Sequence, residues 1–187
     1  MKLLLLVKHS SPEVVEDVPA REWVLSGIGK VRAEKLAEQL RSYKPEIIVS
    51  SVEPKAIQTA EIVARRLALE NKVFENLQEH DRRNSSYHSK DEFRRLVQEF
   101  FFQPDKLIFG SETAVQALDR FRTAVEIVLN QFDNKVIVIV AHGTVISLFA
   151  EWLTGCDGYD LWQKLDLPSF VIIDLQSKRL LEAVNLT

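Results

Sequence analysis

Cysteine is nearly absent from this chain, and long hydrophobic runs are missing from it. The 187 residues include one cysteine, Cys156, so no disulfide can form within the chain. No apolar run approaches the roughly 20 residues that a membrane-spanning helix needs. The run at residues 3–7 follows a single lysine and precedes no small-residue cleavage site, so it does not match a secretory signal. We therefore expect a soluble protein of the cytoplasm.

An excess of one charge is also missing. The chain has 24 basic and 27 acidic residues, a net charge of −3, and so lacks the basic surplus typical of proteins that bind nucleic acid or anionic membranes. It also lacks paired cysteines, His-x-x-x-His spacing and the glycine-rich motifs of nucleotide-binding proteins. We expect no metal or other cofactor, and neither nucleic acid nor a membrane as partner.

Short hydrophobic strands alternate with amphipathic helices along the chain. This alternation predicts an α/β fold, a three-layer sandwich in which helices flank a mainly parallel sheet, within a single domain spanning residues 1–187. The last residues are expected to add an edge hairpin. The expected strands cover residues 3–7, 46–49, 136–141 and 170–175, with a short edge piece at 73–74. The expected helices cover residues 27–41, a stretch ending near 69, and residues 91–102, 113–132 and 143–153.

Two local details are predicted for the helices nearest the N-terminus. Ser26 is a plausible N-cap for the helix at residues 27–41. The apolar face of that helix is expected to contain Ile28, Val31, Leu36, Ala37 and Leu40. Residues 53–55 are expected in a loop that precedes the next helix.

Two of the hydrophobic strands end in histidine. Lys8 and His9 follow the strand at 3–7, and His142 follows the strand at 136–141. The carboxyl ends of parallel strands meet at one edge of a sheet, where ligands bind in open α/β folds. We therefore expect Lys8, His9 and His142 at one site.

Six motifs occur along the chain in the order found in a known family. Together they resemble those of the histidine phosphatase superfamily, which has the phosphoglycerate mutase-like fold. The motifs are Lys8-His9-Ser10, Trp23-Val24-Leu25-Ser26-Gly27-Ile28-Gly29, Ser50-Ser51-Val52-Glu53-Pro54-Lys55-Ala56-Ile57-Gln58-Thr59-Ala60, Leu77-Gln78-Glu79, Gly110-Ser111-Glu112-Thr113 and Ala141-His142-Gly143.

The resemblance implies phosphoryl transfer through a phosphohistidine, without a metal. It makes His9 the nucleophile and Glu79 the residue that protonates the leaving group and then activates water. His80 and Asp81 are alternatives to Glu79, because the register of this loop is uncertain. His142 is implied to contact the phosphoryl oxygens. The amide of Gly143, at a helix start that favours anions, is a further candidate contact.

The sequence departs from the family pattern at three phosphate-binding positions. Lys8 and Lys55 stand where the family has arginine, so the positive charge is kept but the planar fork is lost. Ser10 replaces a glycine, and its hydroxyl either donates to phosphate or crowds the pocket. The loop arginines Arg21, Arg82 and Arg83 either replace the missing arginine charge or are simply exposed.

The implied function is a metal-independent phosphatase that acts on a small phosphorylated metabolite or a phosphoprotein. One alternative is a degenerate member that binds a phosphorylated ligand or partner with little or no turnover, which the two lysines and Ser10 motivate. A phosphomutase is the third alternative, and the modest middle insertion argues against it. Substrate specificity is expected from the loops at residues 10–25 and 79–110, and the oligomeric state is left open.

Overall fold

The computed structural model describes residues 2–83, 88–133 and 135–186. Within these residues, six strands form one sheet in the order β3-β2-β4-β1-β5-β6. The strands are β1 (Leu3–Lys8), β2 (Ile47–Ser50), β3 (Asn71–Val73), β4 (Ile137–Ala141), β5 (Ser169–Asp174) and β6 (Arg179–Asn185).

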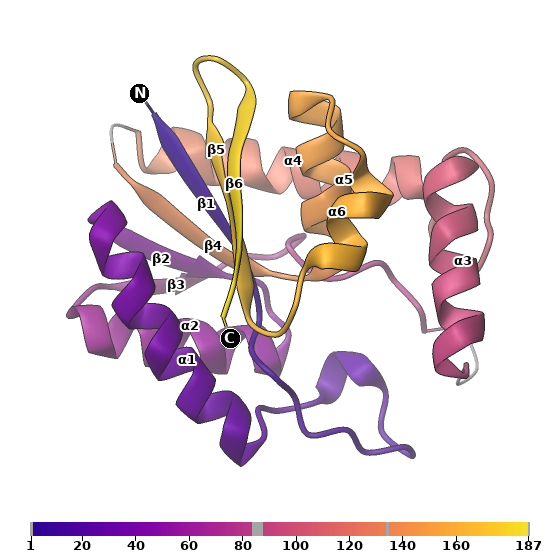
Figure 1. The fold of residues 1–187 in the computed structure, drawn as a ribbon, viewed down its shortest axis with the longest axis horizontal. Coiled ribbons are helices and arrows are strands. Elements are labelled where there is room, and N and C mark those ends of the chain that lie inside the picture. The colour runs from indigo at the N-terminus through magenta and orange to yellow at the C-terminus, as the bar shows by residue number, and fades with distance from the viewer. Residues whose placement is uncertain (1, 84–87, 134, 187) are drawn as a thin grey trace.

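The pairing of the strands is mainly parallel, as predicted. Strand β4 lies between β1 and β2 and is parallel to both, and β3 continues the parallel part beyond β2. Strand β5 is antiparallel to β1, and β6 forms a hairpin with β5 at the sheet edge. The predicted terminal hairpin is therefore confirmed, and β1, β2 and β4 all end at the same edge of the sheet (Figure 1).

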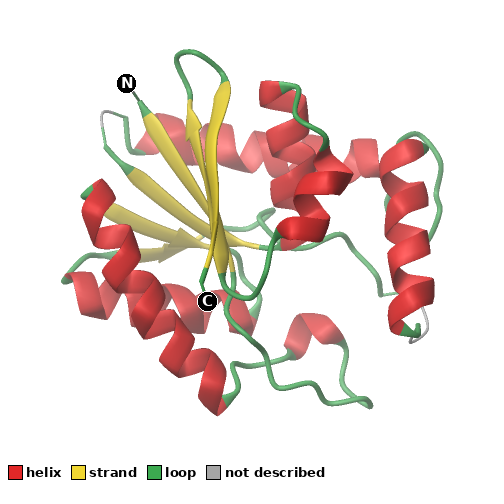
Figure 2. Ribbon diagram, viewed as in Figure 1, coloured by secondary structure: helices red, strands yellow, loops and turns green. Residues whose placement is uncertain are grey.

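Helices cover both faces of the sheet. They are α1 (Gly27–Leu40), α2 (Pro54–Leu67), α3 (Lys90–Phe102), α4 (Ala114–Gln131), α5 (Gly143–Thr154) and α6 (Gly158–Lys164), with short 3-10 turns η1 (Ala20–Glu22) and η2 (Arg41–Tyr43). Helices α1 and α2 lie on one side of the sheet and α4 and α5 on the other (Figures 1 and 2). Among the described residues, no helix combines the length and hydrophobicity needed to cross a bilayer.

The alternation of side chains along β1 explains the three layers. Leu4 and Leu6 are buried in the cluster that includes α4 and α5, whereas Leu5 and Val7 are buried in the cluster with α1 and α2. Successive strand residues point to opposite faces, so a strand that is apolar throughout must be covered on both sides. The predicted three-layer α/β sandwich is confirmed.

Helix α1 begins as predicted, but its buried face is rotated. The Ser26 hydroxyl caps the helix by accepting from the Gly29 amide. The expected burial of Ile28 and Val31 is wrong, since they are 61% and 56% exposed. Gly29 faces inward instead, with its Cα against the Ser11 carbonyl, where a Cβ would lie 2.0 Å from the oxygen. The helix therefore buries Gly29, Ala33, Leu36, Ala37 and Leu40.

Helix α2 begins earlier than predicted. Residues 53–55 were expected in a loop, but Glu53 is the N-cap and Pro54 and Lys55 form the start of the helix. Proline suits this position because its missing N–H has no partner in a first turn. Lys55 is consequently held on the first turn of α2 and is almost fully buried.

Helix α6 is not among the helices predicted from the sequence. Asp157 caps this short helix by accepting from the Asp160 amide. Its apolar pattern is too short to stand out from a loop. The helix ends at Lys164 and is followed by Leu165, whose carbonyl reaches the site described below.

Candidate active site

The ends of β1 and β4 bring the two predicted histidines together. The strands are neighbours, with Lys8 opposite Ala141, so the next residue on each strand is histidine. The His9 and His142 ring centroids lie 5.2 Å apart, and both residues are buried. The predicted meeting of these side chains at one edge of the sheet is confirmed.

The hydrogen bonding of His9 determines which ring nitrogen is free. Its Nδ1 lies 2.8 Å from the Ser10 carbonyl oxygen, which can only accept, so Nδ1 carries the proton. The pKa of His9 lies well below its ordinary value because of burial, followed by the charges of His142 and Lys55. His9 is therefore a neutral imidazole with an unprotonated Nε2, the form in which histidine is a nucleophile.

Ser51 determines the tautomer of His142. The Ser51 hydroxyl lies 2.7 Å from His142 Nε2, and its oxygen accepts from the Glu53 amide. Because the hydroxyl is fully buried, its proton needs an acceptor, and Nε2 is within reach. The proton of neutral His142 then resides on Nδ1, which is buried and has no hydrogen-bond partner among the described residues. His142 thus offers one unused N–H donor beside His9.

Two lysine ammonium groups lie in the same region. Lys8 Nζ donates to the Leu165 carbonyl at 2.6 Å. The Lys8 side chain also passes close to Gly143, where a Cβ would lie 3.2 Å from Lys8 Cε. Lys55 Nζ donates to the Ala20 carbonyl at 2.7 Å and to the Glu53 carboxylate.

Burial lowers the pKa of both lysines. For Lys8 the effect is opposed by Glu79 and Asp166, and for Lys55 it is opposed mainly by Glu53.

The Glu79 carboxylate lies at the N-terminus of α5, the helix that begins immediately after His142. Its carboxylate accepts from the amides of Thr144 at 3.2 Å and Val145 at 3.3 Å, and from the His80 amide at 2.9 Å. Burial alone would raise its pKa, but the Arg82 charge, the electrostatic interaction with His142 and the backbone donors hold the pKa below its ordinary value. The helix dipole of α5 favours the same charged form. Without ligand, Glu79 is therefore a carboxylate.

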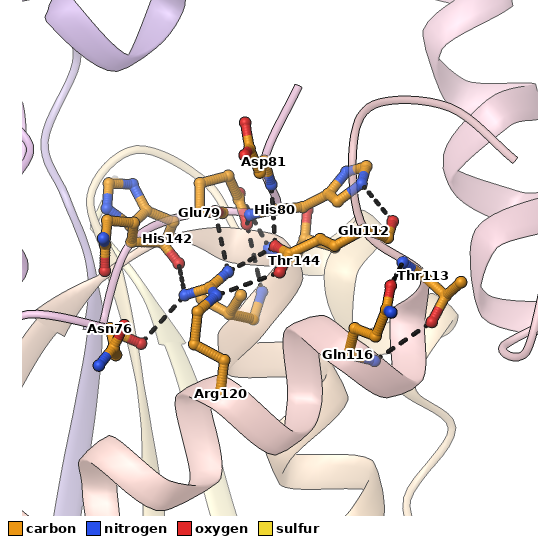
Figure 3. A network of polar contacts seen from close by, with 12 residues as sticks. Asn76, Glu79, His80, Asp81, Glu112, Thr113, Gln116, Arg120, His142 and Thr144 are labelled. Carbon is orange, nitrogen blue, oxygen red and sulfur yellow. Dashed lines mark hydrogen bonds and ion pairs between the residues drawn. The ribbon is translucent and has the colours of Figure 1, made fainter. Parts of the chain in front are cut away.

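A partly buried ion pair between Arg120 and Glu112 fixes the backbone that carries Glu79 (Figure 3). The Arg120 guanidinium donates to the carbonyls of Asn76, Gln78 and Glu79, at 3.0 to 3.2 Å. It also forms a two-point contact with the Glu112 carboxylate, at 2.6 and 3.1 Å. Helix α4 thus holds residues 76–79 at the site.

The same Glu112 carboxylate accepts from the Asp81 amide at 2.9 Å. Glu112 belonged to a predicted motif, whereas nothing in the sequence singled out Arg120. The one sequence feature that could have indicated Arg120 is its spacing, since it lies eight residues after Glu112 in the helix that follows that motif.

The Ser10 hydroxyl, one of the expected phosphate contacts, has a backbone partner in this structure. Ser10 Oγ donates its one proton to the Gly29 carbonyl at 2.7 Å, and its amide donates to Thr59 Oγ1 at 3.0 Å. Ser10 is fully buried. Its side chain and amide therefore connect β1 with α1 and α2 in this structure.

The two alternatives to Glu79 have other partners. The His80 ring packs against Phe100 and Phe109, with centroids 4.2 and 4.6 Å away, and its Nε2 lies 3.1 Å from the Glu112 carbonyl. Asp81 forms a two-point contact with the exposed Arg83. Of the three acidic or basic candidates in this loop, Glu79 has its carboxylate at the start of α5, next to His142.

Sequence reasoning missed Glu53, which is buried at the centre of the site. Its Oε1 accepts from the Glu79 amide at 2.9 Å and lies 3.5 Å from His142 Nε2, and its Oε2 contacts Lys55. Arg82, which the sequence left open, is half-buried, with its guanidinium carbon 5.0 Å from the centroid of the Phe93 ring. Its charge affects the pKa values of Glu79, His142 and Lys55.

The charges around the two neutral histidines favour an anion. Lys8, Lys55 and Arg82 supply three positive charges, and Glu53 and Glu79 supply two negative ones. Within the described part of the chain, no group of three or more histidine, cysteine, aspartate or glutamate side chains is arranged to hold a metal ion. The arrangement provides a nucleophile, an unused N–H donor, an acid–base group and cations, which together suit the transfer of an anionic group.

Comparison with known proteins places this site in a family. One relative, "Uncharacterized phosphatase PhoE" of Bacillus subtilis (strain 168), is 27% identical over 133 residues, which are 71% of this chain and 66%, slightly less than two thirds, of the relative. A mycobacterial glucosyl-3-phosphoglycerate phosphatase structure matches with a TM-score of 0.80 and 20% identity, covering 100% of both chains.

Entamoeba histolytica phosphoserine phosphatase, in complex with 3-phosphoglyceric acid, also matches with a TM-score of 0.80 at 20% identity, covering 100% of this chain and 98% of that one. At such identities these two structures establish the shared fold. The family model described as "Histidine phosphatase superfamily (branch 1)" matches residues 4–187, nearly the whole chain. The chain therefore belongs to the histidine phosphatase superfamily.

Proposed function

We propose that this protein is a phosphatase that hydrolyses a phosphomonoester through a phosphohistidine on His9, without a metal. A phosphohistidine is typical of the family to which the chain belongs. The observation that carries the proposal is the state of His9, whose Nδ1 donates to the Ser10 carbonyl and whose Nε2 is unprotonated beside His142. We assign the activity to one domain spanning residues 1–187, because the sheet contains strands from both ends of the chain.

In the first step, His9 Nε2 attacks phosphorus, the N–P bond forms and the bond to the leaving oxygen breaks. Lys8, Lys55, the Nδ1–H of His142 and the amide of Gly143 contact the phosphoryl oxygens as negative charge develops. Glu79 has a lowered pKa without ligand, and the negative charge of a bound phosphate raises that pKa. Glu79 therefore takes up a proton from solvent as the substrate binds, and it gives this proton to the leaving alkoxide.

In the second step, a water molecule attacks the phosphohistidine. Glu79, now a carboxylate, accepts the proton of that water, the N–P bond breaks and inorganic phosphate leaves. His9 returns to the neutral imidazole, whose Nδ1–H has donated to the Ser10 carbonyl throughout.

We propose a small phosphorylated metabolite as the substrate. Two structural neighbours are described as phosphatases of glucosyl-3-phosphoglycerate and of phosphoserine, and both of those substrates are small phosphorylated molecules. Arg82 adds a cation beside the phosphate-binding lysines, which suits a second anionic group on the substrate. A phosphoprotein is the alternative, and the assay below separates the two by the substrates offered.

A second candidate function is binding of a phosphorylated ligand without turnover. The two lysines favour it, because each occupies a position at which the family pattern has arginine and each already donates to a backbone carbonyl. A lysine lacks the planar fork that binds two phosphoryl oxygens at once.

The test is phosphate release from an aryl phosphate and from a panel of phosphorylated metabolites and phosphopeptides, with EDTA present. The natural protein is compared with His9→Ala and with a Lys8→Arg/Lys55→Arg double variant. Release that His9→Ala abolishes, together with an acid-labile phosphoprotein intermediate, supports the proposal. Activity only in the double variant supports binding without turnover, and release that is unchanged by His9→Ala overturns the mechanism.

A further inference from the structure

Glu53 contacts three separate parts of the candidate site through one carboxylate. Its Oε2 contacts Lys55 Nζ on α2, and its Oε1 accepts from the Glu79 amide at 2.9 Å. The same Oε1 lies 3.5 Å from His142 Nε2, at the end of β4. The residue is only 6% exposed, so these contacts are made away from bulk water.

The position of Glu53 at the start of α2 does not explain its side chain. Glu53 is the N-cap of this helix, but its carboxylate makes no capping hydrogen bond. A buried carboxylate is costly unless it is paired and hydrogen-bonded. The charge is therefore compensated by residues of the site rather than by the helix that it precedes.

Residue 55 is a lysine, and this explains why the Glu53 carboxylate is useful at the site. An arginine presents a rigid planar fork, whereas a lysine presents a point charge at the end of four rotatable carbons. Lys55 is held in one orientation by two acceptors, the Ala20 carbonyl and the Glu53 carboxylate. Glu53 lies two residues before Lys55, so the anchor and the cation belong to one rigid helical start.

We infer that Glu53 is a positioning residue for phosphoryl transfer: it fixes the Lys55 ammonium group in the orientation that an arginine fork would provide by itself. The inference rests on the proposed function and deepens it. Glu53 does not contact the substrate; it acts through Lys55 and through the Glu79 backbone.

The pH at which Lys55 loses its proton can be measured, and it would not change if Glu53 had only a structural role. Burial lowers the pKa of Lys55, and Glu53 opposes that effect by its charge and its hydrogen bond. The other charged or titratable groups around Lys55 are Arg82, which lowers its pKa, Glu79, which raises it, and the buried His9 and His142. Without the Glu53 charge, Lys55 loses its proton at a lower pH.

The test uses four proteins: the natural chain, Glu53→Gln, Lys55→Arg and the double variant. For each, kcat and KM for an aryl phosphate are measured across pH with EDTA present. In the natural background Glu53→Gln is expected to lower kcat about 10- to 100-fold, the usual cost of losing a group that orients a site residue. The alkaline limb of kcat/KM is expected to move to lower pH.

In the Lys55→Arg protein, the same Glu53→Gln change is expected to cost only a few-fold in kcat and to leave the alkaline limb in place. The guanidinium stays protonated at every assay pH and orients itself by its planar fork. An equal loss in both backgrounds, or an unmoved alkaline limb in Glu53→Gln, would overturn the inference. The matched control is Glu61→Gln, an exposed residue of the same helix, which is expected to leave kcat and its pH dependence unchanged.

Should circular dichroism show that Glu53→Gln is unfolded, Glu53→Asp replaces it. This variant keeps the charge but shortens its reach, so kcat falls in the natural background and not in the Lys55→Arg protein. An equal fall in both backgrounds contradicts the inference.

Failure of the proposed function is recognised separately, because the natural protein would then show no His9-dependent phosphate release. The same four proteins are in that case titrated with inorganic phosphate by calorimetry across pH. The alkaline loss of phosphate affinity is expected at lower pH in Glu53→Gln than in the natural chain, and at the same pH in the two proteins that carry Lys55→Arg. Identical pH dependence in all four would overturn the positioning role.

Discussion

At the scale of single residues, the proton on His142 depends on one serine. Ser51→Ala removes the hydroxyl that donates to Nε2 and leaves Nε2 facing the Glu53 carboxylate at 3.5 Å. The ring then favours the tautomer that donates from Nε2, and Nδ1 loses the N–H that we assign to the phosphoryl group. We expect kcat to fall about 10- to 100-fold with little change in KM, measured with an aryl phosphate.

The adjacent residue supplies the control for this prediction. The Ser50 hydroxyl is buried and has no hydrogen-bond partner in the described part of the chain. Ser50→Ala therefore removes a hydroxyl without removing a hydrogen bond, and we expect kcat to stay within about twofold. Equal losses in Ser50→Ala and Ser51→Ala would contradict the tautomer argument.

At the scale of elements, helix α4 holds the Glu79 loop through one ion pair. Arg120→Met removes the donors to three loop carbonyls and the cation that pairs with the partly buried Glu112 carboxylate, which keeps only the Asp81 amide as a donor. We expect a loss of about 2–3 kcal/mol in the free energy of unfolding, measured with urea, because hydrogen bonds to charged groups are lost at a partly buried site. We also expect a lower kcat, since Glu79 is carried by this loop.

Two comparisons separate this effect from a general loss of charge on α4. Arg122 lies on the same helix, is 35% exposed and has its guanidinium carbon 5.1 Å from the Trp152 ring centroid. Arg122→Met is expected to cost about 1 kcal/mol or less. Glu112→Gln combined with Arg120→Met should be less destabilised than the sum of the single changes. Strict additivity would argue against a coupled pair.

The same elements show which features a sequence can predict. Strand ends and helix caps depend on residues close together in the chain, so the positions of His9 and His142 at strand ends and the Ser26 cap were predicted correctly. The inward face of α1 depends on the contact of Gly29 with Ser11, and the spacing of apolar residues along the helix cannot predict that contact. Arg120 and Glu53 were missed because their partners lie on other elements, up to 89 residues away in the case of Glu53 and His142.

At the scale of the whole molecule, the sheet order converts separate motifs into one site. Strand β4 lies between β1 and β2, so the segments that follow these three strands converge at one edge. The alternation of strands and helices predicted that convergence. It did not predict the hydrogen-bond network within it, because the partners of a buried polar group are determined by packing between elements.

Three buried histidines also make the stability of the whole fold depend on pH. The pKa values of His9 and His142 lie well below the ordinary one and that of His80 is also lowered, chiefly through burial, so the folded protein keeps them neutral at a pH where the unfolded chain protonates them. Since the unfolded state then binds more protons, the free energy of unfolding decreases as the pH falls below about 6.5. Three such histidines set an upper limit of about 4.1 kcal/mol per pH unit on this slope. Urea unfolding between pH 7.5 and pH 5.5 measures this slope, and His9→Gln should reduce it by up to about 1.4 kcal/mol per pH unit. A free energy of unfolding that is constant over this range would mean that the folded protein accepts charge on these rings, and the neutral nucleophile assigned to His9 would then be wrong.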